Sequence, residues 1–128
     1  MSASAPLCLG PDQLLTWEDL ERIAHVPSPP LQLTDAARQA LRTAQAAFDD
    51  VQDSGAPIYG VNTGFGPLVE QSAQDASEDA HAHGLIAHLS AGAGHWADPA
   101  SVRATIAARL QALAQGHSAV RPAVDDTL

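Results

Sequence analysis

The amino-acid sequence predicts a mainly α-helical fold, and three observations favour it. Apolar residues recur at spacings of three and four in several segments, as they do on one face of a helix. Residues that cap helices stand before these segments, and glycines stand after them. Of the 128 residues, 26 are Ala, the residue with the strongest helix preference. Helices connected by loops are therefore the expected architecture.

Residues 1–33 are predicted to hold one short helix followed by a proline-rich linker. Thr16 is the expected N-cap, and Asp19 stands three residues later, as in a capping box. The helix should end near His25. Three prolines within the next five residues remove hydrogen-bond donors and favour extended backbone.

A second helix is predicted within residues 34–54, running from Asp35 to about Gln52. Thr34 marks its start, and Gly55 is suited to end it. The apolar face of this helix is expected to consist of Ala37, Leu41, Ala44, Phe48 and Val51.

Two further helices are predicted after the loop that follows. Residues 74–90 are rich in Ala and compatible with a helix that is interrupted at Gly84. Asp98 as N-cap and Pro99 at the first helical position open another helix, which should end at Gly116. Its apolar stripe is expected to comprise Val102, Ile106, Leu110, Leu113 and Ala114.

The whole chain, residues 1–128, is expected to form a single domain or a small subunit. Leu, Ile, Val and Phe make up 27 of the residues, about 21%, close to the composition at which a chain no longer supports its own core. We therefore expect it to bury apolar surface against another chain, and its end without a capping element favours the same view. The expected parts are a helix with its linker (1–33), a helix (34–54), a loop (55–69), and helices with a tail (70–128).

The charge pattern argues against nucleic acid and membranes as partners. The chain has 15 acidic and 6 basic residues, a formal charge of -9, and the basic residues are all Arg without a cluster. No stretch approaches 18 apolar residues, and the first ten residues do not resemble a secretory signal. The single Cys8 cannot form an internal disulfide. A cytoplasmic location is therefore expected.

Motifs for metal and phosphate binding are not indicated. His81 and His83 lie two residues apart, so they would point to different sides of a helix, and no third ligand stands at metal-binding spacing. Neither a GxxxxGK[ST] nor a GxGxxG motif occurs in the sequence. We expect no metal site.

The loop at residues 55–69 is the most informative stretch. Its glycines allow the backbone to bend over a substrate, with Tyr59 exposed on it. A tyrosine in such a place can act as a general base. A buried tyrosine beside a glycine-rich turn is the alternative, and the residues alone leave both open.

Three ordered blocks of sequence carry a resemblance to a known family. The first is Ile58-Tyr59-Gly60-Val61-Asn62-Thr63-Gly64-Phe65-Gly66. The second is Gly84-Leu85-Ile86-Ala87-His88-Leu89-Ser90-Ala91-Gly92-Ala93-Gly94. The third runs from Val102-Arg103-Ala104 through Leu113-Ala114-Gln115-Gly116-His117-Ser118 to Arg121-Pro122. These blocks, over about residues 55–124, resemble those of the aromatic amino acid and histidine ammonia-lyases.

The resemblance implies the N-terminal helical portion of an ammonia-lyase-like fold, completed by another chain, with residues 55–69 as its Tyr loop. Tyr59 matches the family's catalytic base or proton relay. Gly66 matches a position lining the loop, where a side chain would intrude on the substrate. His88 and Leu89 match the pair that contacts the substrate's side chain, and His-Leu is most like the pair in tyrosine ammonia-lyases. An ordinary helix histidine is the alternative for His88.

The family builds an electrophilic prosthetic group, methylideneimidazolone, by cyclising an internal Ala-Ser-Gly. No Ala-Ser-Gly occurs in the 128 residues, so this chain forms no such group. The resemblance therefore implies that the group belongs to a larger partner chain, which would also carry the family's substrate-carboxylate Arg, catalytic Asn and second Tyr.

Two interpretations remain open. In the first, the chain is the small subunit of a hetero-oligomeric, split lyase that eliminates ammonia from an L-tyrosine-like amino acid to give an aryl acrylate. A component of an aromatic aminomutase or of a histidine ammonia-lyase would use the same parts. In the second, the chain is a non-catalytic, lyase-like module that binds an aromatic metabolite or a partner protein. An altered tyrosine or a lost glycine loop would favour the second, and neither is present.

Overall fold

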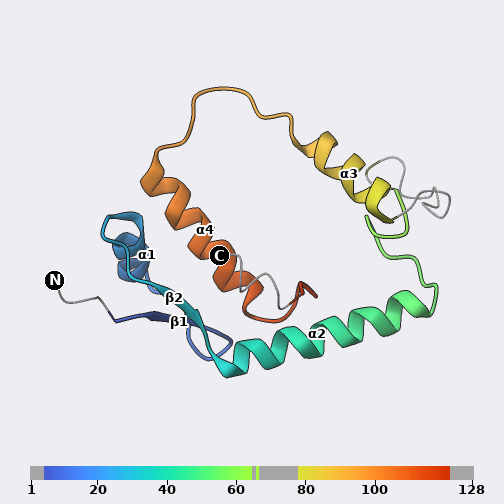
Figure 1. Cartoon of the computed structure of the whole chain (residues 1–128), viewed down its shortest axis with the longest axis horizontal. Helices are drawn as coiled ribbons and strands as arrows, with labels where there is room; N and C mark the ends of the chain where they lie inside the picture. The colour runs from blue at the N-terminus through green and yellow to red at the C-terminus, as the bar shows by residue number, and fades with distance from the viewer. Residues whose placement is uncertain (1–4, 65, 67–77, 122–128) are drawn as a thin grey trace. The chain divides into compact units, whose positions relative to one another are not determined.

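The computed structural model describes residues 5–64, 66 and 78–121, and this part of the chain contains four helices and two short strands. In chain order they are β1 (Leu7–Leu9), α1 (Trp17–Ala24), β2 (Leu31–Leu33), α2 (Asp35–Asp53), α3 (Glu78–Leu89) and α4 (Pro99–Leu113) (Figure 1). The contacts divide the chain into a first unit, Met1–Asp50 with Trp96–Leu128, and a second unit, Val51–His95. The predicted mainly helical fold is confirmed.

Helix α1 begins where the capping pattern predicts. The N–H of Asp19 donates to Thr16 Oγ1 at 3.2 Å, and the N–H of Thr16 donates to Asp19 Oδ2 at 3.1 Å. This reciprocal pair is a capping box. The Thr16 backbone N–H, ahead of the Thr16 hydroxyl, holds the pKa of Asp19 below its usual value of 3.8. The helix ends at Ala24, and His25 is extended as predicted.

Strands β1 and β2 form a parallel pair that the sequence pattern did not predict. Leu7 pairs with Leu31, and Leu9 pairs with Leu33. Each strand has only three residues, too few for an alternating pattern to be distinguished from ordinary loop sequence. A parallel pair requires a crossover connection, and the segment that contains α1 supplies it.

Helix α2 has the predicted start and stop. Thr34 Oγ1 accepts a hydrogen bond from the N–H of Ala37 at 3.1 Å, which satisfies one of the helix's unpaired donors. At the other end, Gly55 has a φ of +72°, the left-handed conformation that commonly ends helices. Of the predicted apolar face, Ala37 and Leu41 are buried, whereas Val51 is exposed.

The predicted apolar stripe of α4 is confirmed only in its C-terminal part. Ala114, just after the helix, is buried in the core cluster and Leu110 packs partly buried against it, whereas Val102 and Ile106 are 41% and 47% exposed. Ala107, which the predicted stripe does not include, is also buried. The helix carries apolar residues on more than one side, so spacing alone does not select the buried face.

Polar side chains of α4, and of Gln115 just beyond it, bind backbone carbonyl groups at both ends of the segment that contains α1. Arg103 donates from its guanidinium to the carbonyl of Ala24, the last residue of α1, where a cation also stabilises the helix dipole. Gln111 and Gln115 both donate to the carbonyl of Gly10, at 3.3 and 3.2 Å. These bonds tie α4 to residues far away in the sequence.

The core of the first unit is small and is built largely from alanine. Leu9, Ala37 and Ala114 form its buried cluster, and leucines 15, 31, 33 and 110 pack around it partly buried. Because apolar burial contributes about 25 cal/mol per Å², a cluster with two alanines supplies little stabilisation. This agrees with the expectation from composition that bulky core residues are few.

Helix α3, in the second unit, runs unbroken through Gly84, so the predicted interruption there is wrong. Glycine costs a helix only about 1 kcal/mol relative to alanine, which weakens a helix without ending it. Parts of three predicted segments lie outside the described residues: 74–77 of the helix, 65 and 67–69 of the Tyr loop, and 122–128 of the tail.

We predict that Gly116→Ala destabilises the chain by about 1–3 kcal/mol. Gly116 has a φ of +75°, and a Cβ there would lie 2.7 Å from the Cβ and 2.9 Å from the carbonyl carbon of Ala40. Denaturant unfolding measures the change. Gly92→Ala is the control, since Gly92 faces open space and has no left-handed φ. Equal stabilities for the two variants would contradict the close approach.

We also predict that the N-cap of α4 makes stability depend on pH. Asp98 Oδ1 accepts from the N–H of Ala100 and of Ser101, both at 3.0 Å. The Ser101 hydroxyl, followed by these N–H groups, lowers the pKa of Asp98 below 3.8. The stabilisation is therefore complete above the unfolded pKa and is lost as the pH falls through the lower folded pKa.

Asp98→Asn provides the test, because an amide caps the helix but does not titrate. The difference in unfolding free energy between wild type and variant should be constant around neutral pH and shrink once the pH falls below about 4. A difference that does not vary with pH would contradict the assignment.

Candidate active site

The four candidate site residues belong to the second unit. Tyr59 and Gly66 lie in the Tyr loop, and His88 and Leu89 end α3. The described contacts bring Tyr59 and Gly66 together, and the other two residues stand on a separate element of the same unit.

Residues 58–62 form a tight turn. The carbonyl of Ile58 accepts from the N–H of Val61 at 3.1 Å and from the N–H of Asn62 at 3.3 Å. Gly60 has a φ of +72°, a conformation that L side chains rarely adopt. The β-branched and aromatic residues of this stretch therefore form a turn and not a strand, because the left-handed glycine reverses the chain.

Tyr59 projects from this turn with 65% of its surface exposed, which agrees with an exposed loop tyrosine and not with a buried one. Its phenol oxygen accepts a hydrogen bond from the N–H of Gly66 at 3.1 Å. Gly66 has a φ of +60°, and among the described residues a Cβ there would meet no atom within 4 Å. This hydrogen bond joins two residues that lie seven positions apart in the loop, so it holds the phenol of Tyr59 against the later part of that loop.

Asn62 and Thr63 supply the polar side chains that organise the turn. Asn62 Oδ1 accepts from the N–H of Ile58 at 2.7 Å, and its Nδ2 donates to the carbonyl of Ala56 at 2.8 Å. Thr63 Oγ1 accepts from the N–H of Gly60 at 3.3 Å and lies 3.0 Å from the carbonyl of Gly64. The sequence pattern did not indicate a role for Asn62, although asparagine among glycines is a known turn signal.

His88 and Leu89 are exposed at the C-terminal end of α3, with Leu89 at 71%. The next residue, Ser90, donates from its hydroxyl and from its N–H to the carbonyl of Ile86, at 2.7 and 2.9 Å. The imidazole of His88 and the isobutyl group of Leu89 therefore belong to consecutive residues at a capped helix end. Such a pair can offer a hydrogen bond and an apolar contact to one aromatic ring.

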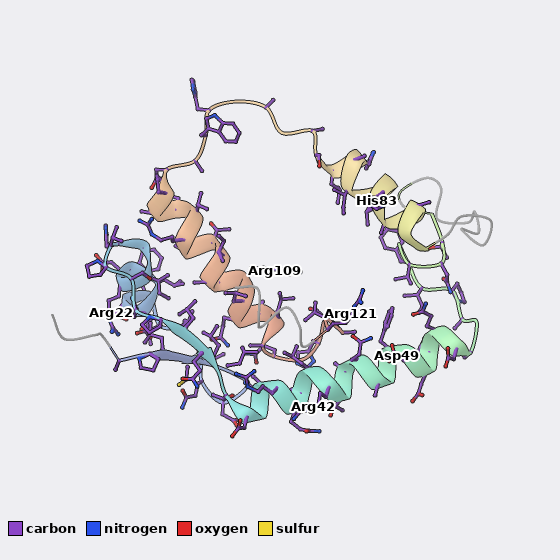
Figure 2. The ribbon with its side chains drawn as sticks, viewed as in Figure 1. Arg22, Arg42, Asp49, His83, Arg109 and Arg121 are labelled. Carbon is purple, nitrogen blue, oxygen red and sulfur yellow. The ribbon has the colours of Figure 1, made fainter. Side chains whose placement is uncertain are left out.

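Four arginines of the first unit stand on different elements. Figure 2 shows Arg22 on α1, Arg42 on α2, Arg109 on α4 and Arg121 beyond α4. Within residues 5–64, 66 and 78–121, no group of His, Cys, Asp and Glu is placed to hold a metal ion. No helix in this part of the chain has the length and apolar character needed to cross a membrane.

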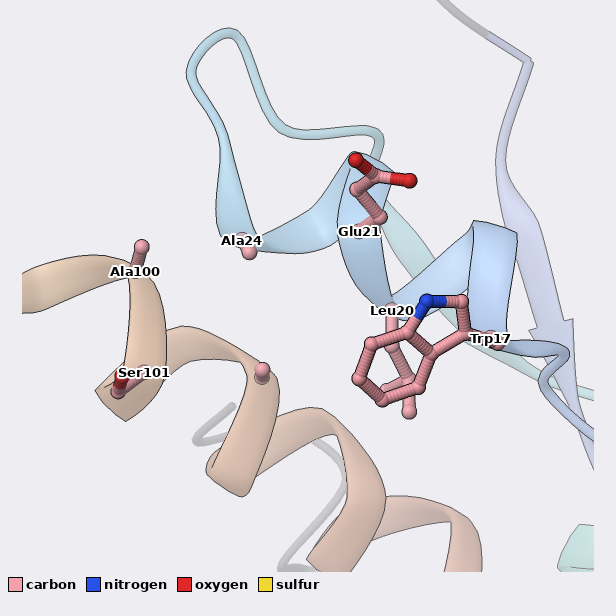
Figure 3. A pocket seen from close by; sticks show the side chains of 7 residues that line it. Trp17, Leu20, Glu21, Ala24, Ala100 and Ser101 are labelled. Atoms are coloured by element: carbon pink, nitrogen blue, oxygen red, sulfur yellow. The ribbon is translucent and has the colours of Figure 1, made fainter.

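A shallow pocket of about 270 Å³ lies between α1 and α4, within the first unit. Its lining residues are Trp17, Leu20, Glu21, Ala24, Ala100, Ser101 and Ala104 (Figure 3). Trp17 stands at its edge with 78% of its surface exposed. The pocket is largely apolar and contains none of the candidate site residues, and the sequence pattern did not indicate it.

The fold and the loop define the class to which the chain belongs. A family model described as aromatic amino acid lyase matches residues 15–128. The chain is therefore a member of the aromatic amino acid lyase family.

Among its relatives, a tyrosine ammonia-lyase of Cupriavidus metallidurans is 39% identical over 94% of this chain and 21% of its own length. A probable histidine ammonia-lyase of Halobacterium salinarum is 39% identical over 77% of this chain and 19% of its own. The crystal structure of a tyrosine aminomutase from Streptomyces globisporus superposes with a TM-score of 0.83 and 28% identity, over 95% of this chain and 23% of that one.

The chain thus spans about a fifth of the length of the curated relatives that it matches. Relatives named for tyrosine and for histidine are equally similar, at 39% identity.

A relative from Streptomyces globisporus, 33% identical, is named an MIO-dependent aminomutase, where MIO is methylideneimidazolone. The residues of this chain do not fit such a group, because the Ala-Ser-Gly from which it forms is missing from the sequence. No chemical step on this group is therefore assigned to the chain itself.

Proposed function

We propose that the chain is the small subunit of a split aromatic amino acid ammonia-lyase and that it supplies the Tyr loop to an active site completed by a larger chain. The observation that carries this proposal is the Tyr loop itself: Tyr59 is exposed and held by Gly66 in a chain of this family. The larger chain carries Ala-Ser-Gly and the electrophilic group made from it.

The apolar surface of the second unit supports a protein partner. Within α3, Leu85, Ile86 and Leu89 lie within an arc of about 100° on one side of the helix, and Ile86 and Leu89 are exposed. Exposed apolar groups that lie next to one another mark surfaces that another protein covers. None of the described residues of the second unit is buried, so the described part of this unit supplies no core for these side chains.

The first unit also presents exposed apolar groups. Trp17 stands beside the pocket between α1 and α4, whereas Val102 and Ile106 are exposed on α4 and are not among the residues that line the pocket. Exposed aromatic and aliphatic groups are typical of sites where partner proteins dock. In the proposed complex the larger chain covers these residues, so the enzyme is a hetero-oligomer.

In the proposed reaction, Tyr59 acts as the base. In its phenolate form, its oxygen takes the proton from the carbon next to the one that bears the amino group and becomes the phenol. The electrons of that C–H bond form the new double bond, and the protonated amino group leaves with the C–N pair as ammonia, which gives an aryl acrylate. The partner's methylideneimidazolone would make the amino group a better leaving group. This chain's own contribution is to hold the proton-accepting oxygen over the substrate.

The substrate of the proposed enzyme is an L-tyrosine-like amino acid. His88 can exchange a hydrogen bond with a phenolic hydroxyl, and Leu89 can pack on the ring. A site built around such a polar partner disfavours an analogue that leaves it unpaired. An aminomutase outcome, in which ammonia returns to the neighbouring carbon, uses the same groups, and the similarity to tyrosine aminomutases favours it as the second candidate.

We predict that Tyr59→Phe reduces turnover of the assembled enzyme by about 10²–10⁴-fold, to near-total loss. Substrate binding should be largely kept, because only the hydroxyl is removed. Since Tyr59 is exposed, the stability of the chain should change by less than about 0.5 kcal/mol. Steady-state rates, with circular dichroism as the folding control, test this. Persisting turnover in a folded variant would show that Tyr59 is not the base.

We also predict that His88→Phe shifts the preference of the enzyme from L-tyrosine toward L-phenylalanine by about tenfold or more in the ratio of kcat/KM. His83→Phe is the matched control, because His83 is an exposed histidine on the same helix. If both variants keep the wild-type ratio, His88 does not select the substrate.

A further inference from the structure

The carboxamide of Asn62 joins two backbone segments on the N-terminal side of Tyr59. Its Oδ1 accepts from the N–H of Ile58 at 2.7 Å, and its Nδ2 donates to the carbonyl of Ala56 at 2.8 Å. Both are shorter than the 3.1 Å bond between Gly66 and Tyr59 Oη. The side chain therefore holds the chain at two points directly before Tyr59.

The backbone of Asn62 closes the same turn from the other side. Its N–H donates to the carbonyl of Ile58 at 3.3 Å, so Ile58 is bound by Asn62 through both of its backbone polar groups. Tyr59 is the next residue in the chain. Its Cα is thus fixed between one residue that Asn62 holds and a left-handed glycine, Gly60.

Asn62 and Tyr59 differ in how much of each side chain is exposed to solvent. Asn62 is half-buried and its two amide atoms are engaged with the backbone, whereas Tyr59 is exposed. From this arrangement we infer that Asn62 is a positioning residue: its carboxamide holds the turn that presents the Tyr59 hydroxyl to the substrate. This inference rests on the proposed function, because it assigns Asn62 to the site that Tyr59 serves.

The two hydrogen bonds use both the acceptor and the donor of the carboxamide, a combination that the side chains of aspartate and alanine do not offer. Aspartate keeps an oxygen for the N–H of Ile58 but cannot donate to the carbonyl of Ala56 while ionised. Alanine loses both bonds, and the backbone groups that they satisfied are exposed to water or left unpaired. The expected order of function is therefore asparagine, then aspartate, then alanine.

Loss of the Asn62 side chain should lower kcat much more than it changes KM. A displaced general base slows the chemical step, and a misplacement of about 1 Å can cost about 10²-fold. Asn62→Ala should therefore reduce kcat of the assembled enzyme by about 10- to 100-fold and change KM less than about threefold. Asn62→Asp should fall between wild type and Asn62→Ala.

Ser54→Ala is the matched control. Ser54 also makes two local hydrogen bonds, donating to the carbonyl of Val51 at 2.6 Å and accepting from the N–H of Ala56 at 3.3 Å. It lies just before the loop and binds neither Ile58 nor Tyr59. A general weakening of the region should appear in Ser54→Ala as much as in Asn62→Ala, whereas a loss of positioning should appear only in the latter.

A spectroscopic measurement on the full chain tests the inference without any activity. The sequence contains one tyrosine and one asparagine, so selective isotope labelling gives one tyrosine ring signal and one asparagine side-chain amide signal. In the wild type, the Asn62 side-chain amide should exchange slowly with solvent. In Asn62→Ala, the Tyr59 ring signal should shift and broaden, and the amide of Gly66 should exchange faster. Ser54→Ala should leave all of these signals unchanged.

The possible outcomes are distinct. The inference is supported if Asn62→Ala changes the Tyr59 ring signal and lowers kcat while Ser54→Ala does neither, and if Asn62→Asp keeps part of the activity. Equal signals and rates in Asn62→Ala and Ser54→Ala overturn it. If the wild-type complex shows no turnover, the proposed function fails, and the ring signal alone then decides whether Asn62 positions Tyr59.

Discussion

The first unit depends on the close approach of its backbone segments. This approach is possible because small residues stand where the segments meet. Ala37 and Ala114 are fully buried beside Leu9, and Gly116 lies against the backbone of Ala40. Small residues permit this contact but bury little apolar area. Hydrogen bonds from Arg103, Gln111 and Gln115 to backbone carbonyls therefore supply part of the long-range order. The unit is specified as much by polar contacts as by its core.

The same shortage of bulky residues explains the surface that the chain presents. Most of its large apolar groups on α3 and α4 are exposed, and a soluble protein seldom leaves such groups uncovered. The chain matches only about a fifth of the length of its relatives. Together with the exposed apolar groups and the hydrogen-bonded turn that carries Tyr59, this motivates the proposed split enzyme.

Features set by neighbouring residues could be predicted from the sequence, and features set by distant partners could not. The caps at Thr16 and Asp98 and the stop at Gly55 depend on bonds within a few positions. The strand pair depends on residues 24 positions apart, and the buried face of α4 depends on where α1 packs. Tyr59 was recognised by the pattern around it, but the role of Asn62 requires knowing that the backbone at Ala56 and Ile58 lies within reach of one carboxamide.

The most direct test of the central claim is the turnover of the reconstituted enzyme. The larger chain that carries Ala-Ser-Gly is assayed by the absorbance of aryl acrylate, alone and after addition of this chain, with L-tyrosine, L-phenylalanine and L-histidine offered separately. The account predicts acrylate only when both chains are present, and most rapidly from L-tyrosine. Equal turnover by the larger chain alone, or a stable complex that consumes none of the three amino acids, would contradict it.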